Sequence, residues 1–166
     1  MKIQRITPQN RERITAFIME RWYTAKMIIR GKEIDMTTVD GLFCEQGRQI
    51  VGLITWLVYA DADRKIMEIA SLDSLCERQG IGTALLAEAV KNAREANARG
   101  EGIKKLILVT TNDNINALRF YQKRGFDMAR LYRNAMEASR KIKPEIPLVG
   151  ENGIPLRHEI EFEMNI

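Results

Sequence analysis

The segment from Lys65 to Thr111 constrains the fold more than any other part of the chain. A β-rich stretch, Lys65 to Leu72, precedes a turn with two glycines, and apolar residues then recur at helical spacing from Ile81 to Arg99. The next stretch, Ile103 to Thr111, is short and rich in Ile, Leu and Val, which is typical of a buried strand. A strand, a glycine turn, a helix and a second strand in this order predict an α/β chain.

The remaining elements follow from periodicity and from turn residues. Further strands are expected at residues 2–6, 41–45, 49–60, 126–132 and 156–164. Further helices are expected at residues 7–21, 22–30, 114–124 and 135–141, and loops at residues 32–40 and 144–155. Together they predict a single domain over residues 1–166. Its fold is a mixed, twisted sheet of six or seven strands, with an antiparallel meander at residues 41–72 and helices on both faces.

Composition narrows the class of protein. The 166 residues, 45% of them hydrophobic, suffice for one core. The two cysteines, Cys44 and Cys76, are too few for a disulfide framework and indicate a reducing compartment. No stretch resembles a signal peptide or a membrane span, so a cytoplasmic protein without a membrane partner is expected. The net charge of +4 is spread along the chain and is a weak indicator of an anionic partner.

The turn before the central helix has the geometry of a phosphate site. Gly80 and Gly82 allow a ligand to approach the backbone closely, and the free N–H groups of a helix start attract anions. A P-loop would need Lys followed by Ser or Thr after its last glycine, and the chain has Thr83 and Ala84 instead. A Rossmann fingerprint would need a third glycine. The glycine turn is therefore either a different kind of phosphate-binding turn or a purely structural turn.

Two motifs resemble those of the GNAT superfamily of acetyl-coenzyme A dependent N-acetyltransferases. The first is the family turn Arg/Gln-x-x-Gly-x-Gly/Ala, which falls on residues 77–82 with Glu77 in place of Arg or Gln. The second is Asn-x-x-Ala-x-x-x-Tyr-x-x-x-Gly-Phe, which places Asn114, Ala117, Tyr121 and Gly125 in register. The resemblance covers Lys65 to Phe126 and implies a GNAT fold, with a cofactor cleft where the strands at residues 65–72 and 103–111 splay apart.

The resemblance also implies where acetyl-coenzyme A binds. The backbone N–H groups of the turn would hold the pyrophosphate; these belong to Arg78, Gln79, Gly80, Ile81, Gly82 and Thr83. Leu72, at the end of the preceding strand, would pair with pantetheine and face the thioester oxygen, so that its N–H stabilises the oxyanion. Asn114 and Ala117 would lie along the cofactor arm.

Two catalytic residues are implied in the same way. Tyr121 would protonate the departing thiolate, and its alternative is a packing role. Glu68 is expected, from strand alternation, on the same face as Ala70 and Leu72, where its carboxylate would take a proton from the amine. A solvated or salt-bridged strand residue is the alternative for Glu68.

The sequence also indicates which metals, nucleic acids and acceptors to expect. No metal site is expected, because His158, in register with Ile160 and Phe162, has no partner ligand in the sequence. Basic residues between Arg119 and Lys143 lack any nucleic-acid signature, so no nucleic acid is expected. The expected acceptor is a small-molecule or peptide amine, and the protein is a monomer or homodimer. A non-catalytic acyl-coenzyme A sensor is the alternative function.

Overall fold

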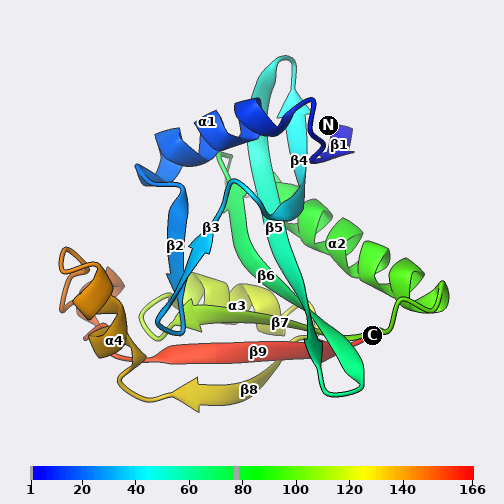
Figure 1. The fold of residues 1–166 in the computed structure, drawn as a ribbon. Coiled ribbons are helices and arrows are strands. Elements are labelled where there is room, and N and C mark those ends of the chain that lie inside the picture. The colour runs from blue at the N-terminus through cyan, green and yellow to red at the C-terminus, as the bar shows by residue number, and fades with distance from the viewer. Residues whose placement is uncertain (1, 77–78) are drawn as a thin grey trace. The chain divides into compact units, whose positions relative to one another are not determined.

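The computed structural model describes residues 2–76 and 79–166. Within them the elements follow in this order: β1 (Lys2–Arg5), α1 (Arg11–Trp22), β2 (Lys26–Ile29), β3 (Lys32–Asp35), β4 (Asp40–Gln46), β5 (Gln49–Asp61), β6 (Arg64–Ser74), α2 (Ile81–Ala98), β7 (Ile103–Thr111), α3 (Ile115–Gln122), β8 (Asp127–Tyr132), α4 (Ala135–Ile142), a 3-10 turn (Glu151–Gly153) and β9 (Glu159–Asn165) (Figure 1). None of these helices is both long enough and apolar enough to cross a membrane.

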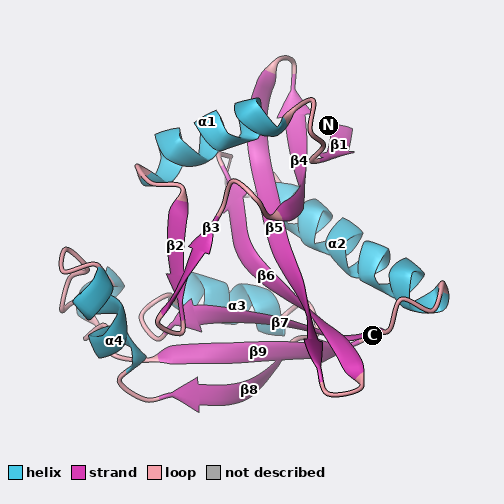
Figure 2. Cartoon of the chain, in the orientation of Figure 1, coloured by secondary structure: helices cyan, strands magenta, loops and turns pink. Residues whose placement is uncertain are grey.

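Seven strands form one sheet in the order β1-β4-β5-β6-β7-β9-β8, and β2 and β3 form a separate ribbon (Figure 2). The pairs β1–β4, β4–β5, β5–β6 and β8–β9 are antiparallel. Because α2 connects β6 to its neighbour β7, these two strands run parallel and the sheet is mixed. The predicted fold class and meander are therefore confirmed.

The chain divides into two compact units. The first contains Met1–Met27, Asp35–Leu106 and Ile166, and the second contains Ile28–Ile34 and Ile107–Asn165. Strand β7 passes from one to the other, so both contribute strands to the same sheet. The expectations of a single domain and of a splay between β6 and β7 stay predictions.

In the first unit, α1 and α2 cover opposite faces of the sheet. Gly52 on β5 lies against α2, because a Cβ atom there would meet Ile81 Cγ2 at 2.5 Å. The next residue of β5, Leu53, pairs with Asp73, whose carboxylate meets Arg21 of α1. Since neighbouring residues of a strand point to opposite faces, the two helices lie on opposite sides.

The structure corrects two predictions near the N-terminus. The helix at residues 22–30 is wrong: α1 ends at Trp22 because Tyr23 adopts a left-handed conformation, with φ 57°. Residues 26–29 and 32–35 instead form a hairpin, so the predicted loop at residues 32–40 is also wrong over its first half. Its turn, Arg30-Gly31, has positive φ at both positions, as a type I′ hairpin turn requires.

Other boundaries differ by a few residues. Helix α1 begins at Arg11, because residues 7–10 close a turn in which Asn10 Oδ1 accepts from Thr7 N–H. Strand β9 begins at Glu159, because the Asn112 side chain holds the residues before it: its Oδ1 accepts from the N–H groups of Arg157 and His158. Side-chain hydrogen bonds to the backbone thus override the local pattern at both places.

We expect Gly52→Ala to destabilise the first unit by about 1–3 kcal/mol, since the added methyl would crowd Ile81 and Leu85 where α2 packs on β5. Urea denaturation measures the free energy of unfolding. Ala87→Ser, on the exposed face of α2, is the control and should change it by less than about 0.5 kcal/mol. Equal stability of Gly52→Ala and the parent would contradict this close packing.

Candidate functional site

The predicted site residues fall into two groups, one in each unit. The first unit contains Glu68, Leu72 and the glycine turn, and the second contains Asn114, Ala117 and Tyr121. Arg78 lies outside the described residues, as does Glu77.

The start of α2 is open to a ligand. Gly80 is the residue before the helix and has a left-handed conformation (φ 76°), and its carbonyl accepts the first helical hydrogen bond, from Ala84 N–H at 2.9 Å. The N-cap glycine has no side chain to cap the helix, and the first turn contains no acidic residue. The Ile81 side chain is buried, so only its backbone faces the turn, whereas Gln79 and Thr83 are exposed. Helix starts of this kind carry unsatisfied N–H groups and a positive dipole end.

Leu72 directs its backbone away from β5. Leu75 N–H donates to Val51 O at 2.9 Å, and residue pairs in an antiparallel ladder alternate between hydrogen-bonded and non-bonded. The pair Leu53–Asp73 is then bonded and the pair Ile54–Leu72 is not. We infer that the N–H and C=O of Leu72 point toward the side on which β7 follows in the sheet.

Glu68 does not share a face with Leu72, which corrects the prediction from alternation. Thr55 pairs with Ser71 and the next residue, Trp56, pairs with Ile69, so Ala70 is an extra residue that forms a β-bulge in β6. The bulge reverses the alternation along the strand. Glu68 pairs with Leu57, and Leu57 shares the face of Leu53, not that of Ile54, which opposes Leu72.

The same bulge gathers polar side chains on the α1 face of β6, and these side chains are named the polar row: Glu68, Ser71 and Asp73. Glu68 is 2% exposed, and Ser71 Oγ lies 2.7 Å from Thr55 Oγ1 in a buried hydrogen bond. Burial raises the pKa of the Asp73 carboxyl, although Arg21 and the Trp22 side chain favour its charged form. Sequence reasoning missed Asp73, because the bulge that aligns it with Glu68 has no signature in the sequence.

In the second unit, Asn114 begins α3. Its Oδ1 accepts a hydrogen bond from Ala117 N–H at 3.0 Å, so two residues of the motif form a helix cap. The other end of α3 closes at Gly125, where φ is 82° and Phe126 N–H donates to Tyr121 O. The spacing of the second motif therefore encodes both ends of one short helix.

Tyr121 is 8% exposed and packs against three aromatic rings. Ring centroids lie 5.1 Å from Phe120, 5.8 Å from Phe126 and 6.0 Å from Phe162. Arg124 stacks on Phe120 with its Cζ atom 3.5 Å from the ring centroid. Burial lowers the pKa of the Arg124 guanidinium, and Tyr121 acts in the opposite direction, so these side chains interact electrostatically.

The His158 side chain accepts a hydrogen bond from the backbone of the second unit. Its Nδ1 accepts from Asn134 N–H at 2.9 Å, which leaves the other ring nitrogen to carry the proton. Among residues 2–76 and 79–166 there is no cluster of three His, Cys, Asp or Glu side chains able to hold a metal.

Comparisons with known proteins point to one family. The model of the acetyltransferase (GNAT) family matches residues 8–126. Two uncharacterized proteins of Bacillus subtilis are similar: YxbD is 47% identical, covering 89% of this chain and 87% of YxbD, and YdhI is 41% identical, covering 95% of each.

Solved structures share the fold. A GNAT family acetyltransferase from Elizabethkingia anophelis, with acetyl-coenzyme A bound, has a TM-score of 0.65 at 19% identity, covering 99% of this chain and 97% of that one. A GNAT acetyltransferase from Streptococcus pneumoniae has a TM-score of 0.70 at 17% identity, covering 99% of both chains. The fold expected from the two motifs is confirmed.

The capping role of Asn114 predicts different effects for two substitutions. Asn114→Ala removes the acceptor for Ala117 N–H and should lower the free energy of unfolding by about 1 kcal/mol. Asn114→Asp keeps an acceptor oxygen at a helix start, where negative charge is favourable, and should match the parent. Urea denaturation of the three proteins tests this, and equal losses for both variants would contradict the cap.

Proposed function

Because this chain belongs to the GNAT acetyltransferase family, we propose that it transfers an acetyl group from acetyl-coenzyme A to a primary amine by direct attack. The observation that carries the proposal is the open start of α2 at Ile81, a few residues after β6 ends at Ser74. A structural neighbour from Elizabethkingia anophelis holds acetyl-coenzyme A, which supports the same cofactor here.

The backbone of the α2 start would hold the pyrophosphate. Helix α2 is 18 residues long, and its first N–H groups belong to Ile81, Gly82 and Thr83. The N-cap residue Gly80 is left-handed and has no side chain that could cover these groups. Whereas Asn114 caps α3 from within the chain, α2 leaves this role to an anion.

Leu72 would serve the acetyl end of the cofactor. Its N–H and C=O point away from β5, as a pantetheine arm that pairs with the strand edge requires. An N–H in this position also faces the thioester oxygen. Attack by the amine places negative charge on that oxygen, and a fixed donor stabilises charge that appears only during the reaction.

Cofactor binding should raise the melting temperature. At 100 times the dissociation constant, binding contributes about 2.7 kcal/mol, or roughly 5–10 °C for a chain of this size. Gly82→Asp should abolish this rise by repelling the pyrophosphate. Because aspartate at a helix start is favourable, the ligand-free variant should remain as stable as the parent, which separates lost binding from lost folding. No shift of the parent at saturating acetyl-coenzyme A would refute the cofactor assignment.

Tyr121 and Glu68 would move the protons. The amine nitrogen attacks the thioester carbon, the carbon–sulfur bond breaks, and the thiolate takes a proton from the Tyr121 hydroxyl. A thiol of pKa about 8.5 and a tyrosine of about 10 are close enough for this transfer. Glu68, on the α1 face of β6, would take the proton that the ammonium loses, directly or through water.

We expect Tyr121→Phe to keep stability and coenzyme A affinity while turnover falls by about 10²–10⁴-fold, because the ring contacts with Phe126 and Phe162 survive and only the hydroxyl is lost. Calorimetry and thiol release on the same preparation measure the two properties. Phe126→Leu is the control, because it disturbs the packing around Tyr121 and keeps the hydroxyl. Its main effect should be a lower free energy of unfolding. Unchanged turnover of Tyr121→Phe would end the general-acid assignment.

The proposal also includes the class of acceptor, the location in the cell and the oligomeric state. Small-molecule and peptide amines both remain acceptor classes, and a non-catalytic acyl-coenzyme A sensor is the alternative, which predicts binding without turnover. Free Cys44 and Cys76 are consistent with a cytoplasmic protein. One domain over residues 1–166, as monomer or homodimer and without nucleic acid, remains part of the proposal.

A further inference from the structure

The polar row contains one carboxylate that the proposed reaction does not use. Asp73 directly follows Leu72, so their Cα atoms are about 3.8 Å apart. Leu72 faces the α2 side, whereas Asp73 faces α1. On the α1 face, the polar side chains next to Leu72 are therefore those of Ser71 and Asp73.

The cation beside Asp73 is held loosely. The Asp73 side chain is 12% exposed, whereas that of Arg21 is 43% exposed, and Arg21 Nη2 lies 3.7 Å from Asp73 Oδ1. By contrast, Arg13 on the same helix contacts Glu45 directly. Because the Arg21 end of this pair is partly exposed to water, another cation can take its place while the buried Asp73 carboxylate stays paired.

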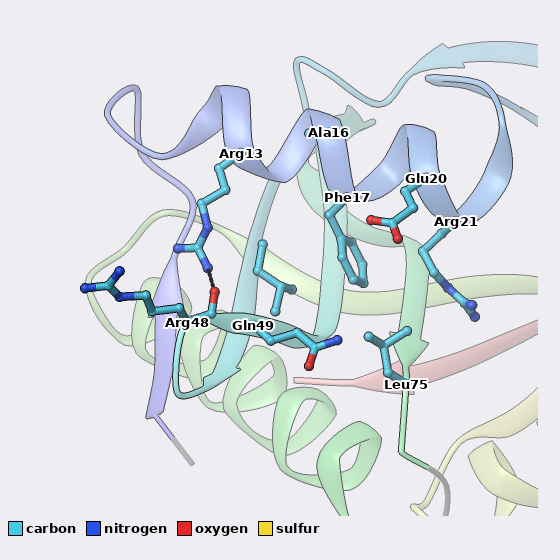
Figure 3. Close-up of a pocket in the computed structure, with 9 residues that line it drawn as sticks. Arg13, Ala16, Phe17, Glu20, Arg21, Arg48, Gln49 and Leu75 are labelled. Atoms are coloured by element: carbon cyan, nitrogen blue, oxygen red, sulfur yellow. Dashed lines mark hydrogen bonds between the residues drawn. The ribbon is translucent and has the colours of Figure 1, made fainter.

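A cavity gives Arg21 room to move. It has a volume of about 370 Å³ and lies between α1, the start of β5 and Leu75, and Arg21 forms part of its wall (Figure 3). Its other charged lining groups are Arg13, Glu20 and Arg48. From β5, the residue opposite Asp73 is the apolar Leu53, and among the described residues the ion-pair partner of Asp73 is Arg21 of α1.

We propose that Asp73 is the residue that first binds the ammonium group of the arriving acceptor, which takes the place of Arg21 there before the amine moves along β6 toward Glu68, about 13 Å away. The proposal rests on the proposed acetyl transfer and adds the residue that recognises the substrate: the acceptor arrives as a protonated primary amine, and a neutral or anionic nucleophile is excluded. Asp73 contacts the substrate, and Arg21 holds the site closed until an amine replaces it.

The electrostatics of Asp73 agree with this role. Burial raises the pKa of its carboxyl, which shows that Arg21 and Trp22 do not compensate the loss of water. A second cation would restore the charged form. Because the raised pKa means that Asp73 takes up a proton at a higher pH than an ordinary aspartate, amine affinity should fall as pH drops through that range.

Two substitutions at the ion pair should act in opposite directions. With a primary amine that the parent acetylates, at pH 8, Asp73→Asn should raise the acceptor KM about tenfold or more and leave the KM for acetyl-coenzyme A unchanged. Arg21→Ala removes the competing cation and should lower the acceptor KM about two- to fivefold. Asp61→Asn, which breaks the exposed pair with Arg64, is the matched control and should change neither KM.

A purely structural pair between α1 and β6 predicts the same direction for both variants, since either one breaks it. If Asp73→Asn and Arg21→Ala both raise the acceptor KM, or both leave it unchanged, the proposal is overturned. If no amine is acetylated, the acetyl-transfer proposal fails by itself. Calorimetry of n-butylamine against the protein with coenzyme A then decides about Asp73: weaker binding to Asp73→Asn than to the parent supports it, and equal or absent binding overturns it.

Discussion

The extra residue Ala70 in β6 determines which side chains of this strand lie on each face of the sheet. A regular strand would place Glu68 and Leu72 on one face, and Asp73 on the other. With the bulge, Glu68, Ser71 and Asp73 share the α1 face, while the Leu72 side chain packs toward α2. Its backbone is left to point along the plane of the sheet. The side chains proposed to bind an amine and the backbone groups proposed to bind a thioester are thereby separated on one strand.

The N-termini of helices α2 and α3 differ in how they are capped. Helix α3 is capped by its own Asn114, so its start is satisfied within the protein. Helix α2 begins at a left-handed glycine that cannot supply such a bond, and its first turn has no carboxylate. An uncapped start costs stability in the free protein, and an anion that binds there recovers it. The contrast agrees with the proposed role of the glycine turn in anion binding and with the observed role of Asn114 as the cap of α3.

The sequence predicted most of the architecture because its strongest patterns are local. The amphipathic helix at residues 81–99 and the meander need only periodicity and turn residues, whereas the two motifs are recognised by their resemblance to those of the GNAT family. The wrongly predicted element boundaries lie where one backbone angle or one side-chain hydrogen bond decides the local structure. The left-handed Tyr23 ends α1, Arg30-Gly31 closes a hairpin, and the Asn112 side chain makes β9 begin later than predicted. Asp73 could not be found, because the bulge at Ala70 and the approach of Arg21 from a distant helix depend on tertiary packing.

Mass spectrometry of the acceptor tests the central claim most directly. The protein is incubated with acetyl-coenzyme A that carries a deuterated acetyl group and with a set of primary amines, and the products are weighed. At least one amine should gain a single deuterated acetyl group, with one free thiol released for each product and none formed without protein. Saturable binding of acetyl-coenzyme A with no labelled amine in any reaction would contradict this claim and would identify the chain as a binding module.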